Sequence, residues 1–169
     1  MKGFGDLALS VYLARPHSRR FAYGLGSSVL FPSAPSKYLG RKKLAIGPAA
    51  VVMYKPNWGR IGLFARNIWS VAGDDERKDI NRLNLQPSLR YRFSPKWFLI
   101  SNPNIVANWK EERENRWLVP VGGGLGTTGL GAKKSSISAQ FYYFIERPTN
   151  GVKWMLEFKY AFLHSNSIK

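Results

Sequence analysis

The sequence contains no cysteine and only two histidines, His17 and His164. Without cysteine the chain cannot form a disulfide, a Cys-ligated zinc site or a thiol nucleophile, and two histidines are too few for a histidine-rich metal centre. Acidic residues are also scarce, since 10 Asp and Glu stand against 26 Lys and Arg, which gives a formal net charge of +16. We therefore expect no metal, no cofactor and no catalytic residues.

Long apolar runs are missing as well. No stretch reaches the roughly 18 residues of a membrane-spanning helix, and the chain does not begin with the charged and apolar segments of a signal peptide. The mean hydropathy of −0.27 is compatible with a membrane protein made of strands, because alternating strands average near zero. The 169 residues fit one domain, and their 14% aromatic content exceeds that of a disordered basic tail.

A strict alternation of apolar and polar residues runs from 82 to 93. A strand separates the two kinds of side chain onto opposite faces, whereas a helix would mix them. The same alternation returns near the C-terminus, over 153–163. In the first segment the apolar set is Leu83, Leu85, Pro87, Leu89, Tyr91 and Phe93, and the polar set is Arg82, Asn84, Gln86, Ser88, Arg90 and Arg92.

Nine segments have the composition of strands, and most hold about 8–13 residues, longer than the ~5–6 of an ordinary strand and close to the ~9–11 that cross a bilayer when tilted. The sequence therefore predicts an all-β protein, an antiparallel up-and-down transmembrane β-barrel meander in a single domain over 1–163, followed by a polar tail over 164–169. The predicted strands are 6–13, 21–31, 44–54, 60–71, 82–93, 97–109, 116–127, 136–145 and 153–163.

The connections between these segments differ in length. The long ones are 32–43, 72–81 and 110–115, and the short ones are 55–59 and 94–96. Outer-membrane barrels carry long loops outside and short turns in the periplasm, and single-chain bacterial barrels have an even strand number. We therefore expect the long connections to be external, and nine strands to be the C-terminal part of a larger barrel, with about twelve strands.

Basic residues recur on the predicted polar strand faces. They could form a cationic lumen that favours anionic or polar solutes, or they could be an ordinary solvated interior, in which charges cost little because water is present. Glu157 lies between Lys153 and Lys159 and predicts local charge pairing. The residues expected to line the lumen are Arg66, Arg82, Asn84, Gln86, Arg90, Arg92, Lys153, Glu157 and Lys159.

The tryptophans lie near predicted strand ends, as do several tyrosines. This bias favours aromatic belts at the two interfaces of a membrane over ordinary core aromatics. Acidic residues cluster in two of the long connections, at 74–79 and 111–114. The first cluster lacks the ligand spacing of an EF-hand, so it is interpreted as a solvated external loop, with weak bridging of lipopolysaccharide by divalent ions as the alternative.

Two further motifs admit catalytic or cofactor interpretations. Gly124–Gly129 matches G-x-G-x-x-G, but an alternating strand rather than a helix follows it, so glycine in a strand and its turn is the better interpretation. The pair His164 and Ser165 stands in the polar tail, and adjacent residues of an extended chain point to opposite faces, which is poor geometry for a base and its nucleophile.

Four elements together resemble those of a family of outer-membrane proteins linked to transport in the meta-pathway of phenol degradation. The resemblance covers about 3–163 and implies an outer-membrane β-barrel that serves as a channel for aromatic or other small solutes. This chain differs in its strong positive charge. The elements are Gly3-Phe4-Gly5-Asp6, Ile68–Gly73 before the acidic loop, Leu85-Gln86-Pro87 and Trp117–Gly124.

The sequence thus predicts a passive pore or transporter in the bacterial outer membrane. Its expected partners are outer-membrane lipid, lipopolysaccharide and small anionic or aromatic solutes, with no specific nucleic acid. The alternative is a soluble basic β-barrel that binds nucleic acid through charge and stacking aromatics. A lipid-modifying enzyme within a barrel is disfavoured because no credible catalytic triad is present.

Overall fold

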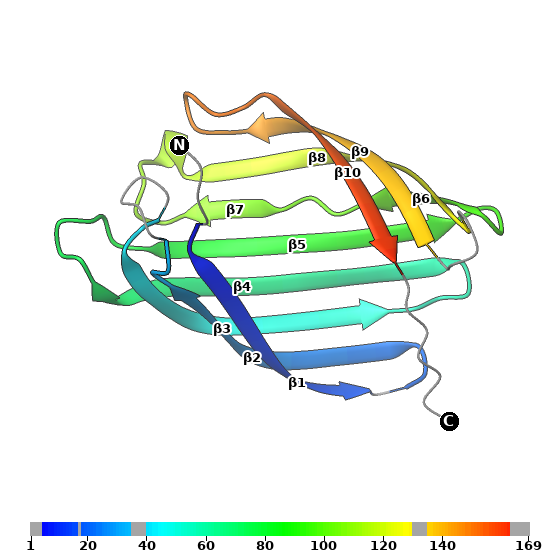
Figure 1. Cartoon of the computed structure of the whole chain (residues 1–169), viewed down its shortest axis with the longest axis horizontal. Coiled ribbons are helices and arrows are strands. Elements are labelled where there is room, and N and C mark those ends of the chain that lie inside the picture. Colours follow the sequence, from blue (N-terminus) through cyan, green and yellow to red (C-terminus); the bar gives the residue numbers. More distant parts are fainter. Residues whose placement is uncertain (1–4, 17, 35–39, 130–134, 163–169) are drawn as a thin grey trace.

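A computed structural model describes residues 5–16, 18–34, 40–129 and 135–162, which form one antiparallel β-sheet (Figure 1). The predicted all-β class and meander order are confirmed. The strands are β1 (Leu7–Pro16), β2 (Phe21–Phe31), β3 (Lys43–Tyr54), β4 (Gly59–Gly73), β5 (Asn81–Arg92), β6 (Trp97–Ser101), β7 (Ile105–Asn108), β8 (Trp117–Thr128), β9 (Ser135–Glu146) and β10 (Trp154–Phe162), with one 3-10 turn, η1 (Arg113–Asn115).

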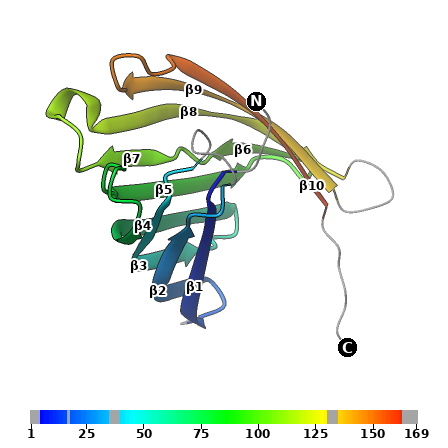
Figure 2. The same cartoon turned by 60° about the vertical axis from the view of Figure 1, so that its left-hand side comes forward.

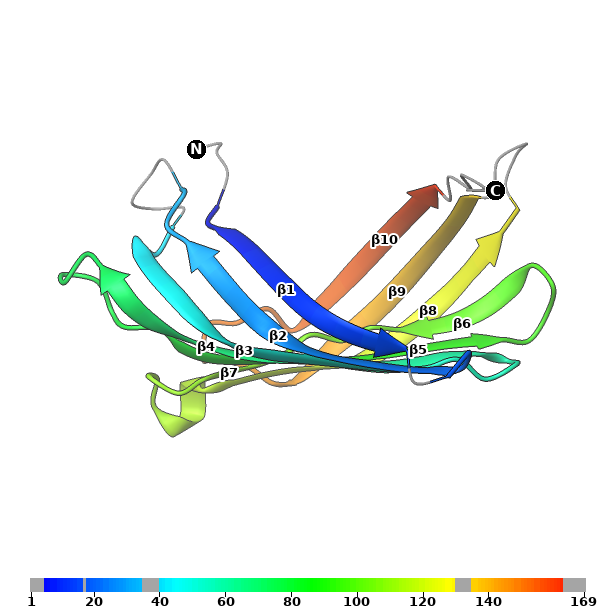
Figure 3. The same ribbon diagram turned by 90° about the horizontal axis from the view of Figure 1, so that it is seen from below.

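Each strand pairs with the strands before and after it in sequence, except that β6 and β7 together occupy one row between β5 and β8. Within the described residues the sheet thus has nine rows, and β1 and β10 each have one neighbour. The sheet is bent into a trough with these two strands at its rims, as Figure 3 shows, and Figure 2 shows the bend from the side. Closure into a barrel stays a prediction.

The predicted strand 97–109 is interrupted, which is a correction to the nine-strand expectation. Its two pieces keep one register against β5, because Leu89 pairs with Ser101 and Leu85 with Ile105. Pro87 and Pro103 therefore face each other at the interruption. Neither proline has an N–H to donate to the ladder, so hydrogen bonding between the strands stops there without any residue being inserted.

The concave side of the sheet can be identified from one contact between separated strands. Tyr12 of β1 and Phe64 of β4 have ring centroids 6.0 Å apart, although β2 and β3 lie between them. Three strand spacings amount to about 14 Å on a flat sheet, so the two rings meet because the sheet bends toward their side. The face that carries Tyr12 and Phe64 is the inner face of the trough.

A small apolar cluster closes one end of this inner face. Ala45, Ile68 and Ile80 are almost fully buried and pack together. Ile80 comes from the β4–β5 loop, and the loop is held over the sheet because Ser70 and Ile80 exchange hydrogen bonds at 2.8 and 3.1 Å. None of the helices described is of the length and apolarity required to cross a membrane.

Candidate functional site

The outer face of the sheet is apolar along every row. Cα pairing places Leu63 opposite Pro87, Leu99 opposite Leu125, and Phe158 opposite Ala139 on this face. Many of its large side chains are well exposed, including Leu13 at 87%, Phe158 at 70% and Leu25 at 67%. An exposed apolar surface of this extent is typical of an interface with lipid or protein rather than with water.

Tryptophans lie at both ends of the outer face. Trp97, Trp117 and Trp154 are each the first residue of a strand. Two ring contacts add Trp109 and Trp58 to the aromatic residues at these ends. Trp109 packs edge-on against Trp117 at 5.8 Å, and Trp58 lies 5.5 Å from Tyr91. The indole N–H of Trp109 donates to Asn67 at 3.0 Å. The tryptophans thus form two belts that flank an apolar band, in which Phe141 and Phe158 stand among aliphatic side chains.

The inner face carries the residues that the sequence predicts to line a lumen. The register places Arg66 opposite Asn84 and puts Glu157 opposite Gln140 on this same face. The rest follow by alternation along their strands, except Lys153, which precedes β10 and accepts a hydrogen bond from the Phe144 N–H through its carbonyl. The shared face is a structural observation, and the lining of a solute path stays a prediction.

The four arginines expected to line the lumen, Arg66, Arg82, Arg90 and Arg92, fall into two groups. Arg82 and Arg90 are eight residues apart on β5, which corresponds to about 27 Å. Arg66, opposite Asn84, lies near Arg82, whereas Arg90 and Arg92 lie near Arg60, the Cα partner of Arg90. Charges separated by this distance are screened from each other at physiological salt. The inner face therefore has two positive patches, one at the loop end and one at the turn end.

In the turn-end patch, Arg90 is held in place by a buried aromatic ring. The guanidinium of Arg90 lies 3.6 Å from the centre of the Phe98 ring, which is a close cation–π contact. Phe98 is 2% exposed and its ring covers Gly126, its Cα partner on β8. The glycine leaves room for the ring, and the ring holds the arginine. Arg90 is thus fixed by packing rather than free in solvent.

A chain of hydrogen bonds crosses the other half of the inner face. The backbone N–H of Asn102 donates to the Tyr142 hydroxyl at 2.7 Å, and that hydroxyl donates to Gln140 at 2.8 Å. Gln140 donates to Glu157 at 3.0 Å, and Glu157 forms an ion pair of 3.1 Å with Lys159. The charge pairing predicted for Glu157 is therefore with Lys159.

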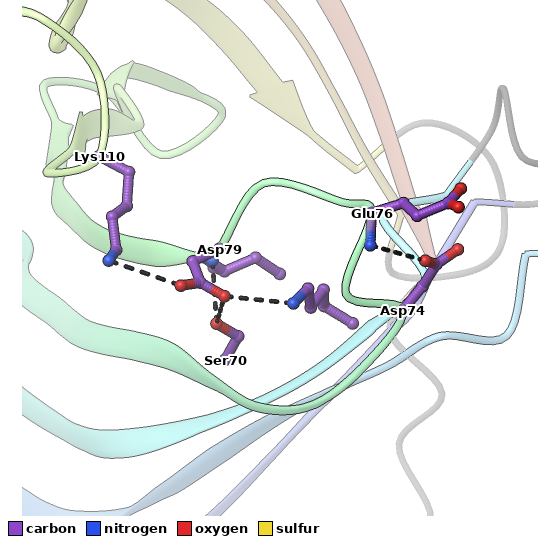
Figure 4. A network of polar contacts seen from close by, with 7 residues as sticks. Ser70, Asp74, Glu76, Asp79 and Lys110 are labelled. Atoms are coloured by element: carbon purple, nitrogen blue, oxygen red, sulfur yellow. Dashed lines mark hydrogen bonds and ion pairs between the residues drawn. The ribbon is translucent and has the colours of Figure 1, made fainter.

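The two acidic connections contact each other at the loop end. Asp79 accepts hydrogen bonds from Lys43 at 3.2 Å and Ser70 at 3.1 Å, and Lys110 lies 3.7 Å from its other oxygen (Figure 4). Lys78 and Glu111 form a second bridge of 3.6 Å between the same two loops. The hydrogen bonds from Lys43 and Ser70 lower the pKa of Asp79 below its ordinary value. These acids are not all simply solvated, because Asp79 joins three segments.

Three arginines of the inner face were not predicted as site residues. Arg60 has the same parity as Arg66 on β4, so alternation alone could have identified it. Arg116 lies immediately before β8, in a row without any predicted arginine, and its carbonyl accepts the N–H of Asn108, the Cα partner of Arg82. Arg41 lies in the β2–β3 loop, where no periodic signal exists. Its position depends on Asp6, whose two carboxylate oxygens accept the backbone N–H groups of Ala34 at 3.3 Å and Arg41 at 2.7 Å.

The remaining sequence motifs do not form a metal site or a nucleotide-binding turn within the described residues. In the part of the chain that the structure describes, no three His, Cys, Asp or Glu side chains are placed to hold a metal ion. Gly124 and Gly126 lie inside β8, and the next described element is the strand β9, so the G-x-G-x-x-G match belongs to a strand. His164 and Ser165, the tail 164–169 and the motif residues Gly3 and Phe4 fall outside the described residues.

Comparison with known proteins gives no relative for this chain. No protein-family model, no curated protein and no solved structure matches it.

Proposed function

We propose that this chain forms the wall of an outer-membrane β-barrel through which small solutes diffuse. The proposal depends mainly on one observation: an exposed apolar face with aromatic belts at both strand ends stands opposite a polar, arginine-bearing inner face. A bilayer would cover the apolar band, and the belts would lie at its two interfaces. Water in the trough would solvate the polar side, so the mechanism needs no cofactor and no reaction.

The length of the strands supports the same proposal. Most rows hold 9 to 15 residues, which meets the ~9–11 residues that a tilted strand needs to cross a bilayer. A soluble nucleic-acid binder would require the basic surface to be accessible and the opposite face to be covered by a core. No described segment covers the outer face, so the alternative is the weaker one.

Tryptophan quenching by brominated lipids tests the proposal. The full chain is refolded into phosphatidylcholine vesicles whose acyl chains carry bromine either near the headgroup or near the bilayer centre. All six tryptophans lie near strand ends, so shallow bromine should quench their emission more strongly than deep bromine. Vesicles without bromine are the control. Equal emission in all three lipids, together with tight, salt-sensitive binding of a single-stranded oligonucleotide, would instead support the soluble alternative.

A further inference from the structure

Three arginines from distant parts of the chain line one hollow at the loop end of the inner face. They are Arg41 of the β2–β3 loop, Arg82 of β5 and Arg116 immediately before β8. The register brings the last two together, because Asn108 is the Cα partner of Arg82 and donates its N–H to the carbonyl of Arg116 at 2.8 Å. The hollow has a volume of about 380 Å³, within the usual range for a small-molecule pocket.

The guanidinium groups in this hollow are not ion-paired with any of the described residues. The Nε atoms of Arg82 and Arg116 are buried without a hydrogen-bond partner. Glu111 is the one acidic side chain in the lining, and its oxygens contact Lys78 at 3.6 Å and Asn108 at 3.4 Å. Guanidinium groups that lack an ion-pair partner favour a bound anion, which can accept hydrogen bonds from their terminal N–H groups.

One part of the lining is apolar, whereas Asn108 and Asn115 add polar groups elsewhere in it. Val106, Leu118 and Pro148 contribute to the wall, and Val106 is 6% exposed. Val106 and Leu118 are Cα partners on neighbouring strands, so they form a continuous patch beside the arginines. A fully hydrated inorganic anion would gain nothing from this patch. An anion with a short hydrocarbon body would bury that body against it, at about 25 cal/mol for each Å² removed from water.

The loop that carries Arg41 is tied to the sheet before any ligand binds. Asp6 accepts the Arg41 backbone N–H at 2.7 Å, and the Lys42 carbonyl accepts the N–H of Asp74 at 3.1 Å. These bonds hold both ends of the short segment next to the hollow. Holding the backbone in place reduces the conformational entropy that binding would otherwise cost.

We infer that this hollow binds small carboxylates that carry a short apolar body. The planar carboxylate would accept hydrogen bonds from the guanidinium groups, and Arg is suited to this by its fork of donors. The inference deepens the proposed function, on which it rests, by naming the class of solute that enters from the loop end. The loop-end patch would then bind the solute. The turn-end patch would not share this role, because the guanidinium of Arg90 stacks on Phe98.

Calorimetric titration of the full chain in detergent micelles with hexanoate at low salt tests the site. Hexanamide, which has the same body without the charge, should bind much more weakly. Arg82→Gln and Arg116→Gln should each weaken hexanoate binding by about tenfold or more, the usual effect of losing a hydrogen bond to a charged group. Arg19→Gln removes an equal charge from the β1–β2 turn at the other end and should leave the Kd unchanged.

Arg41→Gln provides a second variant, since its side chain is exposed and its loss should not disturb the sheet. Equal binding of hexanoate by the wild type and all these variants, or tighter binding of inorganic phosphate than of hexanoate, would overturn the inference. Titration of protein-free micelles corrects for partitioning. If hexanoate binds in micelles but brominated lipid does not quench the tryptophan emission, the site stands and the pore is refuted. If the emission is quenched but hexanoate does not bind, the site alone is refuted.

Discussion

The hydroxyl of Tyr142 accepts a 2.7 Å hydrogen bond from the backbone N–H of Asn102, at the point where β6 ends and the ladder is interrupted. Tyr142 belongs to β9, and β8 lies between the two residues. The tyrosine spans that strand because its Cα partner there is Gly122, which has no side chain to obstruct it. A side chain from two rows away thus satisfies a backbone donor in the gap between the pairing of β6 with β8 and that of β7 with β8.

Removing this hydroxyl should destabilise the sheet without changing its face pattern. Tyr142→Phe leaves the Asn102 N–H without its partner, at an expected cost of about 1–3 kcal/mol in the free energy of unfolding. Urea titration followed by tryptophan emission measures it. Tyr143→Phe is the matched control, because this neighbouring tyrosine is half exposed on the outer face. A loss as large in the control as in Tyr142→Phe would contradict the role given to the bond.

Gly126 should not tolerate a side chain. A Cβ at this position would overlap the ring of Phe98, which is almost fully buried and supports the Arg90 guanidinium. We expect Gly126→Ala to destabilise the fold by about 1–3 kcal/mol through overpacking. Gly129→Ala provides a contrast, because a Cβ added there would meet no neighbouring atom. Any loss of stability in that variant would come from the φ of +85°, which is unfavourable for alanine.

The double variant Gly126→Ala/Phe98→Leu separates packing from backbone effects. If the ring is the cause of the loss, a smaller residue at 98 should recover part of the stability of Gly126→Ala. The same urea titration measures this recovery. No recovery would place the cause in the backbone of β8 instead.

The apolar band predicts an asymmetric response to a charge on β5. Leu85 lies on the outer face and Gln86 on the inner face. Leu85→Arg should cost about 2–4 kcal/mol in vesicles, the expected cost near the midplane, whereas Gln86→Arg should cost much less. The measurement is the unfolding free energy of each variant refolded into vesicles. Equal costs would contradict the assignment of the outer face to lipid.

Stability should depend on Asp79 at low pH. Its folded-state pKa lies below the ordinary 3.8 because Lys43 and Ser70 donate to the carboxylate. A group with a lowered folded pKa contributes stability that is fully present above the unfolded pKa and is lost as the pH falls through the folded pKa. Wild type should thus exceed Asp79→Asn in stability at pH 5, and the difference should vanish below the folded pKa.

A titration of unfolding midpoints from pH 6 to pH 2 checks this dependence. Asp75→Asn is the control, since Asp75 lies in the same loop and forms no hydrogen bond or ion pair within the described residues. A pH dependence that is identical in wild type and Asp79→Asn would show that the bonds to Asp79 contribute nothing.

The proposed pore should prefer anions, and its two positive patches should act independently. Arg82→Glu and Arg90→Glu change charges about 27 Å apart, farther than the ~8 Å screening length at physiological salt. Each should shift the reversal potential toward cation preference, and the shifts should add in the double variant. Planar-bilayer recording under a salt gradient measures them. Cation preference in the wild type would show that neither patch governs permeation.

Much of the fold could be predicted from the sequence because side-chain period follows directly from strand geometry. The alternation over 82–93 is sufficient to place Arg82 and Leu83 on opposite faces, and the observed pairing agrees. Observed strands such as β2 and β5 begin and end within one residue of the prediction. The tryptophans could be placed in the same way, because their distance along the sequence from the predicted strand ends is known without the structure.

The interruption between β6 and β7 could not be predicted in this way. At the interruption Pro103 faces Pro87 on the neighbouring strand, and this opposition depends on register. Register also decides that Phe98 covers Gly126 and that Tyr142 reaches Asn102 over Gly122. Such contacts join residues that are far apart in sequence, and no local period encodes them.

The sequence by itself determined the class, the meander and the two faces of this protein, because alternation and turn spacing are local properties of the chain. Only the tertiary structure decided how the charges are grouped. It separated Arg82 from Arg90 along β5 and brought Arg41 and Arg116 to the same hollow as Arg82. The physical reason is that grouping depends on which strands become neighbours and on how far the sheet bends, and both result from pairing across the whole sheet.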